Sequence, residues 1–138
     1  MSGHGESTMM EQVLRSMRTI AVVGASDRPE RASHGVASYL QRAGFHVIAV
    51  NPKLSGELFG NPVHAALEDI PSPIDVVDVF RRPEDVPPVV DSAIRVGAKA
   101  VWLQLGITHP EAEAKARAAG LAVISDHCLK VEHARLVP

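Results

Sequence analysis

The feature that most constrains this chain is a short apolar run, Thr19-Ile-Ala-Val-Val, which ends abruptly at Gly24-Ala25-Ser26 and is followed by a helical pattern. A run of this length predicts a buried strand, and the glycine allows a tight turn after it. A strand, a turn and a helix in this order leave free backbone N–H groups and the positive end of the helix dipole at the turn, where a phosphate group can bind. The turn therefore predicts a nucleotide-binding site.

The usual dinucleotide fingerprint, Gly-x-Gly-x-x-Gly, is incomplete here, because Ser26 stands at the second glycine position and no third glycine follows at that spacing. An NAD site also places Asp or Glu roughly twenty residues after the turn, to hold the ribose hydroxyls. This chain has Asn51-Pro52-Lys53 after its second apolar run. A lysine there can attract a phosphate on the ribose, which favours NADP or coenzyme A over NAD. The alternative is an exposed loop lysine without a ligand.

The rest of the chain continues the alternation of strand and helix. Apolar runs at 45–50, 74–80, 100–105 and 121–125 predict four more strands, with helical patterns between them. Ser33 is the candidate N-cap of the first of these helices, and Gly44 ends it. Such alternation predicts parallel strands with helices on both faces. We expect one Rossmann-like, doubly wound α/β domain over residues 19–138, with its five strands in the order 3-2-1-4-5.

Residues 1–18 precede this domain. Residues 1–7 are small and polar, and we expect them to form a frayed leader. Thr8 and Glu11 have the spacing of a capping box, and the apolar residues after them recur at helical spacing, so a short helix is expected next.

The composition limits the function further. A chain of 138 residues fits one compact domain, and a net charge of -2 argues against nucleic-acid binding. The single cysteine, Cys128, excludes an internal disulfide, and no apolar run approaches the roughly 20 residues that span a bilayer. Without a signal-peptide pattern, we expect a cytoplasmic protein that binds neither nucleic acid nor membrane.

Further candidate ligand residues follow the third and fourth strands, since ligands bind outside the carboxyl ends of the strands in open parallel sheets. Arg81 and Arg82 can bind a phosphate, although pairing with nearby carboxylates is the alternative. Gln104 offers amide hydrogen bonds, and Gly106 allows close approach. Asp78 lies within the third strand, where we expect an arginine or backbone N–H groups to pair with it.

Catalytic patterns are scarce. The histidines do not form a zinc-binding motif, and the chain lacks a Gly-x-Ser-x-Gly elbow and a P-loop. Cys128 stands beside His127, but adjacent helical residues do not face each other, so a small buried cysteine is favoured over a nucleophile. We assign no catalytic residue and no metal site, and a binding protein is favoured over an enzyme.

Five motifs together resemble one known family: Val-Val-Gly-Ala-Ser, Val-Asn-Pro-Lys, Asp-Val-Phe-Arg-Arg-Pro-Glu, Val-Trp-Leu-Gln-Leu-Gly-Ile and Asp-His-Cys-Leu-Lys-Val-Glu-His. From Thr19 to Leu136 the chain is similar to the small stand-alone CoA-binding domain proteins of bacteria. These are related to the N-terminal CoA-binding domain of succinyl-CoA synthetase alpha subunits.

The resemblance implies a CoA ligand across the carboxyl edge of the sheet. It places the turn Gly24-Ala25-Ser26 near the pyrophosphate, and Asn51-Pro52-Lys53 near the adenosine and its phosphate. The adenine or the pantetheine arm would be bordered by Phe80-Arg81-Arg82 and by Gln104-Leu105-Gly106-Ile107. Arg31, between the turn and the next helix, is counted with these ligand residues. His127 departs from the arginine that the resemblance would place there.

We therefore expect a non-catalytic module that binds coenzyme A or an acyl-CoA. An NADP-dependent oxidoreductase and a subunit of an acyl-CoA ligase are the alternatives from the enzyme class. A regulatory module that senses CoA through a protein partner is a third hypothesis.

Overall fold

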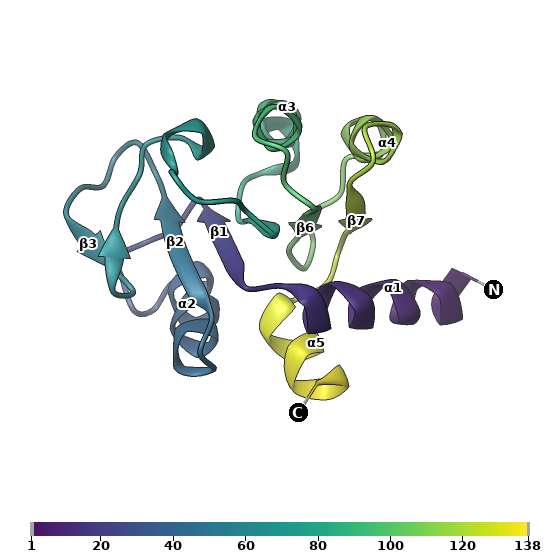
Figure 1. The fold of residues 1–138 in the computed structure, drawn as a ribbon, viewed down its shortest axis with the longest axis horizontal. Helices are drawn as coiled ribbons and strands as arrows, with labels where there is room; N and C mark the ends of the chain where they lie inside the picture. Colours follow the sequence, from purple (N-terminus) through teal and green to yellow (C-terminus); the bar gives the residue numbers. More distant parts are fainter. Residues whose placement is uncertain (1, 138) are drawn as a thin grey trace.

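A parallel sheet of five strands forms the centre of the molecule, and helices cover both of its faces (Figure 1). The computed structural model describes the backbone of residues 2–137. The strands are β1 (Thr19–Val23), β2 (His46–Val50), β5 (Val76–Val79), β6 (Ala100–Leu103) and β7 (Ala122–Ile124). Because both faces are covered, nearly every strand residue is buried, which is why the strands read as continuous apolar runs. The expected single Rossmann-like α/β domain is confirmed.

The two faces have separate cores. Helices α3 (Val86–Arg95) and α4 (Pro110–Ala118) cover one face together with the 3-10 turn η1 (Leu67–Asp69). The opposite face is covered by α1 (Ser2–Ser16), α2 (Ala32–Arg42) and α5 (Leu129–Leu136). Successive strand residues alternate between these cores, so Val22 faces α2 and Val23 faces α3.

The strand order is β2-β1-β5-β6-β7, which corrects the expected order 3-2-1-4-5. The third strand along the sheet-forming part of the chain, β5, pairs with β1 instead of lying beyond β2. The place beyond β2 is taken by the segment that follows it, since His64 forms a parallel bridge with Val50. All four residues of β5 are buried, and a strand of this kind buries more apolar surface between two neighbours than at an edge.

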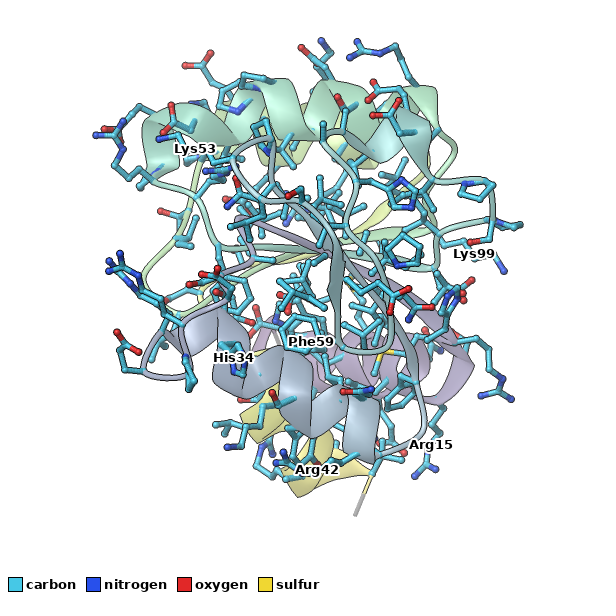
Figure 2. The ribbon with its side chains drawn as sticks, turned by 90° about the vertical axis from the view of Figure 1, so that its left-hand side faces the viewer. Arg15, His34, Arg42, Lys53, Phe59 and Lys99 are labelled. Carbon is cyan, nitrogen blue, oxygen red and sulfur yellow. The ribbon has the colours of Figure 1, made fainter. Side chains whose placement is uncertain are left out.

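A short hairpin of β3 (Glu57–Leu58) and β4 (Asn61–Pro62) follows β2. The amide of Asn61 donates to the carbonyl oxygen of Val47 at 2.9 Å. The ring of Phe59 meets the ring of His34 on α2 edge-on, with 5.1 Å between centroids, and the two side chains lie together in Figure 2. These contacts fix the hairpin to both the edge strand and α2.

The two helix starts nearest the N-terminus differ from expectation. α1 begins at Ser2, so residues 2–7 are helical and not a frayed leader, and the carboxylate of Glu6 holds this turn through a 3.1 Å contact with His127. Arg31 occupies the N-cap position of α2, whereas Ser33, the expected N-cap, lies buried inside the helix. A preceding turn, in which the N–H of Arg31 donates to the carbonyl oxygen of Arg28, starts the helix two residues early. Met1 and Pro138 lie outside the described residues.

Asp78 lies within β5 on the face covered by α1, α2 and α5, and its side chain is completely buried. Among the residues that the structure describes, no group is within hydrogen-bonding distance of either carboxylate oxygen. The expected pairing with an arginine or backbone N–H groups is therefore wrong. Burial without a partner raises the pKa of Asp78 well above its ordinary value of 3.8, because the charged form has lost its water.

We expect Asp78→Asn to flatten the pH dependence of stability. A carboxyl group whose pKa rises on folding leaves the protein most stable below its unfolded pKa of 3.8, and that stability is lost as the pH rises towards the folded pKa. Each pH unit in this window costs about 1.4 kcal/mol of the wild-type free energy of unfolding. Urea unfolding of both proteins from about pH 4 to about pH 8 measures the difference in slope.

Asp75→Asn is the matched control from the same segment. Burial works to raise the pKa of Asp75, but the N–H groups of Thr19 and Arg18 and the ammonium group of Lys99 outweigh it, so its pKa lies below 3.8. Its contribution is present above pH 3.8 and is lost as the pH falls through the folded pKa, which is the opposite sign. Equal pH slopes for wild type and Asp78→Asn would contradict the assignment of a raised pKa to Asp78.

Candidate functional site

β1 and β5 are neighbours in the sheet, but the helices that follow them lie on opposite faces. The helix after β1 is α2, and the helix after β5 is α3. Connections that diverge in this way open a crevice at the carboxyl ends of the two strands, where ligands bind in open α/β sheets. A groove of about 600 Å³ lies there. It is lined by Gly24, Ala25, Ser26, Asp27, Arg28, Arg31, Ala32, Ser33, Asn51, Lys53, Leu54 and Phe80.

Gly24 lines this groove just after β1, close to the backbone of Phe80, which follows β5. Its φ of 85° lies in the left-handed region, and a Cβ atom added to it would overlap the carbonyl oxygen of Phe80. The N–H of Gly24 still donates to the carbonyl oxygen of Val50 at 3.0 Å. Glycine is therefore required here for close contact between the ends of two strands, in addition to the tight turn.

Asn51 ties together the loops that follow β1 and β2. Its amide nitrogen donates to the carbonyl oxygen of Ala25 at 2.8 Å, and its amide oxygen accepts from the N–H of Lys53 at 2.9 Å. The hydroxyl of Ser26 accepts from the N–H of Arg28 at 3.1 Å. These bonds hold the glycine turn and the Lys53 loop in one fixed arrangement, so Asn51 acts here as a positioning residue.

The groove carries three cations, Arg28, Arg31 and Lys53, that make no ion pair with any of the described residues. The backbone N–H groups at the start of α2 add partial positive charge to the same place. One carboxylate, Asp27, also lines the groove. Most basic side chains elsewhere are neutralised by neighbours, as Lys115 is by Asp91 at 2.7 Å. The groove is therefore a local anion-binding environment on a protein with a slightly negative net charge.

A second cavity, of about 180 Å³, lies on the α3 side of the same strand ends. Each of its residues Val23, Val50 and Arg81 is the immediate sequence neighbour of a residue that lines the groove. Its remaining lining is mostly apolar: Ala65, Ala66, Leu67, Pro88, Val89 and Ser92. The carboxyl edge of β1 and β2 thus carries a cationic groove on one side and a mainly apolar cavity on the other.

Seven of the ligand residues expected from the sequence line the groove: Gly24, Ala25, Ser26, Arg31, Asn51, Lys53 and Phe80. Pro52, also expected, lies between Asn51 and Lys53 in the sequence. The others lie apart from the groove. Arg82 is mostly exposed and pairs with Asp85 at 3.2 Å. Gln104 is buried, and its amide oxygen accepts from the N–H of Leu129, which caps α5. The N–H of Gly106 donates to Asp126, and Ile107 packs against the core under α3 and α4.

Sequence reasoning missed Arg28 and Ser33 as groove residues. Arg28 comes four residues after Gly24, in the connection that must pass over the ligand side before α2 begins, and this position was a signal that could have been used. Ser33 was interpreted as a helix cap, and its place in the groove depends on α2 starting earlier.

His127 and Cys128, the residues considered for nucleophilic chemistry, lie just before α5. The ring nitrogens of His127 contact Glu6 and Glu132, at 3.1 and 3.5 Å, while Cys128 is half-buried before α5. Within the described residues, no three His, Cys, Asp or Glu side chains are arranged to hold a metal ion. None of the described helices is both long enough and apolar enough to span a membrane.

Comparison with known proteins identifies the family of this chain. Residues 18–134 match the family described as CoA binding domain. The chain belongs to this family. It is 41% identical over 125 residues to YneT of Bacillus subtilis (strain 168), covering 91% of this chain and 92% of YneT. A solved structure of a hypothetical protein from Pyrococcus horikoshii OT3 superposes with a TM-score of 0.91 and 39% identity, covering 96% of this chain and 92% of that one.

A more distant structure shares the fold. The dinucleotide-forming acetyl-coenzyme A synthetase 1 of Ca. Korarchaeum cryptofilum matches with a TM-score of 0.70 and 23% identity, over 84% of this chain and 28% of the synthetase chain. The fold of this CoA-binding domain therefore also occurs as part of a much longer chain.

We expect Gly24→Ala to destabilise the protein by about 2 kcal/mol or more, because the added Cβ meets the Phe80 carbonyl and the positive φ is strained. Gly97→Ala is the matched control, since Gly97 also has a positive φ, of 71°, but open space around its Cβ position. That variant should lose only about 1 kcal/mol. Urea denaturation of the three proteins measures both values, and equal losses would show that the contact between Gly24 and Phe80 is easily relaxed.

Proposed function

We propose that this protein binds coenzyme A, or an acyl-CoA, in the groove at the carboxyl ends of β1 and β2, without a reaction of its own. The observation that carries the proposal is the gathering of Arg28, Arg31 and Lys53 around the glycine turn, with no ion pair to any carboxylate in the described part of the chain. The chain also belongs to the CoA binding domain family. Coenzyme A presents a diphosphate and a separate ribose phosphate, and so needs cations at two places along one groove.

The diphosphate fits the turn Gly24-Ala25-Ser26 and the start of α2. Backbone N–H groups at a helix N-terminus bind phosphate oxygens, and α2 is long enough to contribute its dipole. Arg28 and Arg31 flank this position and suit phosphate oxygens with their forked donors. Lys53 follows β2 and lines the same groove, and the ribose phosphate would lie beside it. Asn51 would contribute by fixing the distance between the two phosphate positions.

The adenine ring fits the mainly apolar cavity on the α3 side, which begins at the residues next to those of the groove. Arg81 lines this cavity, and a guanidinium group can stack on a planar base. The pantetheine arm would then leave the groove past Phe80, towards the loop that contains Gly106 and Ile107. Leu105 in that loop is 72% exposed and offers an apolar contact for the arm.

Two further hypotheses belong to the enzyme class. NADP also carries a ribose phosphate, so Lys53 supports an NADP-dependent oxidoreductase as well. The fold shared with part of an acetyl-coenzyme A synthetase supports a subunit of an acyl-CoA ligase. Both would require reacting groups from a substrate-binding partner or a second chain.

Calorimetric titration of the purified protein, stripped of bound ligand, with CoA, dephospho-CoA, NAD and NADP tests these alternatives. We expect selective binding of CoA. Preference for NADP would replace the proposal with the oxidoreductase, and absence of binding by all four ligands would contradict it.

We expect Lys53→Ala to weaken CoA binding about tenfold and dephospho-CoA binding much less, because only CoA carries the ribose phosphate. Arg31→Ala should weaken both ligands alike, since it acts on the shared diphosphate. Arg42→Ala is the matched control, because Arg42 lies at the far end of α2 from the groove, well away from Lys53 (Figure 2). If Lys53→Ala weakened the binding of CoA and of dephospho-CoA equally, Lys53 would not bind the ribose phosphate.

A further inference from the structure

Asp78 lies directly beneath the groove. In the ladder between β1 and β5 it stands opposite Val22, and the groove residues Gly24 and Phe80 each follow two residues later. Two residues of a strand span roughly 7 Å. Phe80 and Asp78 point to the same face of the sheet, because side chains two apart in a strand share a face. The buried carboxyl group is therefore about one layer of side chains from the glycine turn.

Apolar residues flank this carboxyl group in the sheet, since Val22 of β1 and Trp102 of β6 stand opposite Asp78 in the two ladders. The core on the same face of the sheet also contains Leu14 and Met17 of α1, Val36 and Leu40 of α2, and Leu129 of α5. The indole N–H of Trp102 is already used, since it donates to the carbonyl oxygen of His127 at 2.9 Å.

The described acidic groups and histidines on the same covering elements have partners of their own. On α5, Glu132 pairs with Arg135 at 2.7 Å, and His133 bonds to Tyr39 of α2 at 2.8 Å. On α1, Glu11 pairs with Arg15, and on α2, His34 bonds to Ser38. His127, before α5, contacts Glu6 and Glu132. None of these described groups reaches the oxygens of Asp78. A negative charge on Asp78 would therefore be neither paired nor screened.

An unscreened charge at this depth acts on the groove above it. Coulomb energies fall only as the inverse of distance, and they are several times larger in a protein interior than in water. A carboxylate on Asp78 would repel a diphosphate at the glycine turn, whereas the neutral acid would not. By linkage, a ligand that binds the neutral form more tightly must also strengthen proton binding at Asp78.

We propose that anion binding in the groove is coupled to a proton on Asp78, so that the protein with neutral Asp78 is the form that binds the diphosphate of its ligand. This regulation rests on the proposed function. Rising pH removes the proton from Asp78, adds a negative charge under the glycine turn and releases the ligand. Ligand binding in turn takes up a proton from solution when Asp78 is partly ionised.

Dephospho-CoA is the probe for the test, because it keeps the diphosphate but lacks the phosphate monoester, which itself titrates at about pH 6. Calorimetric titrations from about pH 5 to about pH 9 should show wild-type affinity falling at least about tenfold with rising pH. Asp78→Asn should keep the high affinity throughout that range. Asp75→Asn, from the same segment but at the other end of the sheet, should retain the wild-type pH dependence.

Titrations in two buffers with different heats of ionisation give a second readout, the number of protons taken up on binding. We expect net proton uptake on binding, and its disappearance in Asp78→Asn. The same pH dependence of affinity in wild type and Asp78→Asn, or no proton uptake by wild type at any pH in the range, would overturn the coupling. Failure of both CoA and dephospho-CoA to bind any of the proteins would instead overturn the proposed function.

Discussion

The close contact between the ends of β1 and β5 is the constraint on which the site depends. It requires glycine at position 24, because the carbonyl group of Phe80 occupies the space that a side chain would fill. It also brings together the two strands whose helices leave on opposite faces, which opens the groove. The same backbone approach therefore stabilises the centre of the sheet and creates its ligand crevice.

Rigidity around the groove comes from polar side chains that bond to backbone groups. Asn51 is the main example, since one amide joins the loops after β1 and β2. Loops held in this way lose little further entropy on binding, which favours affinity. Because the amide of Asn51 already bonds to Ala25 and Lys53, we expect Arg28, Arg31, Lys53 and the backbone of the turn to make most of the ligand contacts.

Much of the fold could be predicted from local pattern, because apolar runs, helical spacing and turn glycines such as Gly44 act over a few residues. The strand order could not, since the choice between an edge and a central position for β5 depends on where His64 and its neighbours settle. Asp78 shows a related limit. Its place in an apolar strand indicated burial. That no described residue bonds to it follows from the apolar side chains that α2 and α5 contribute to this core.

The candidate site was also predictable only where local sequence determines position. Residues immediately after β1 and β2 reach the groove because strand ends determine their position, as Ser26 and Lys53 show. Arg82 and Gln104 also follow strands, but Arg82 pairs with Asp85, and Gln104 accepts a hydrogen bond from the N–H of Leu129. Those partners depend on how η2 (Pro83–Asp85) and α5 pack, which local sequence does not specify.

The hairpin held by Phe59 and Asn61 has a consequence for how this molecule meets copies of itself. Exposed edge strands invite pairing with other chains, which is a common route to aggregation. Here the carboxyl half of β2 is already engaged by His64, and the opposite edge strand, β7, has only three residues. One edge of the sheet is thus partly covered and the other ends in a short strand, and both features disfavour edge-to-edge pairing between copies.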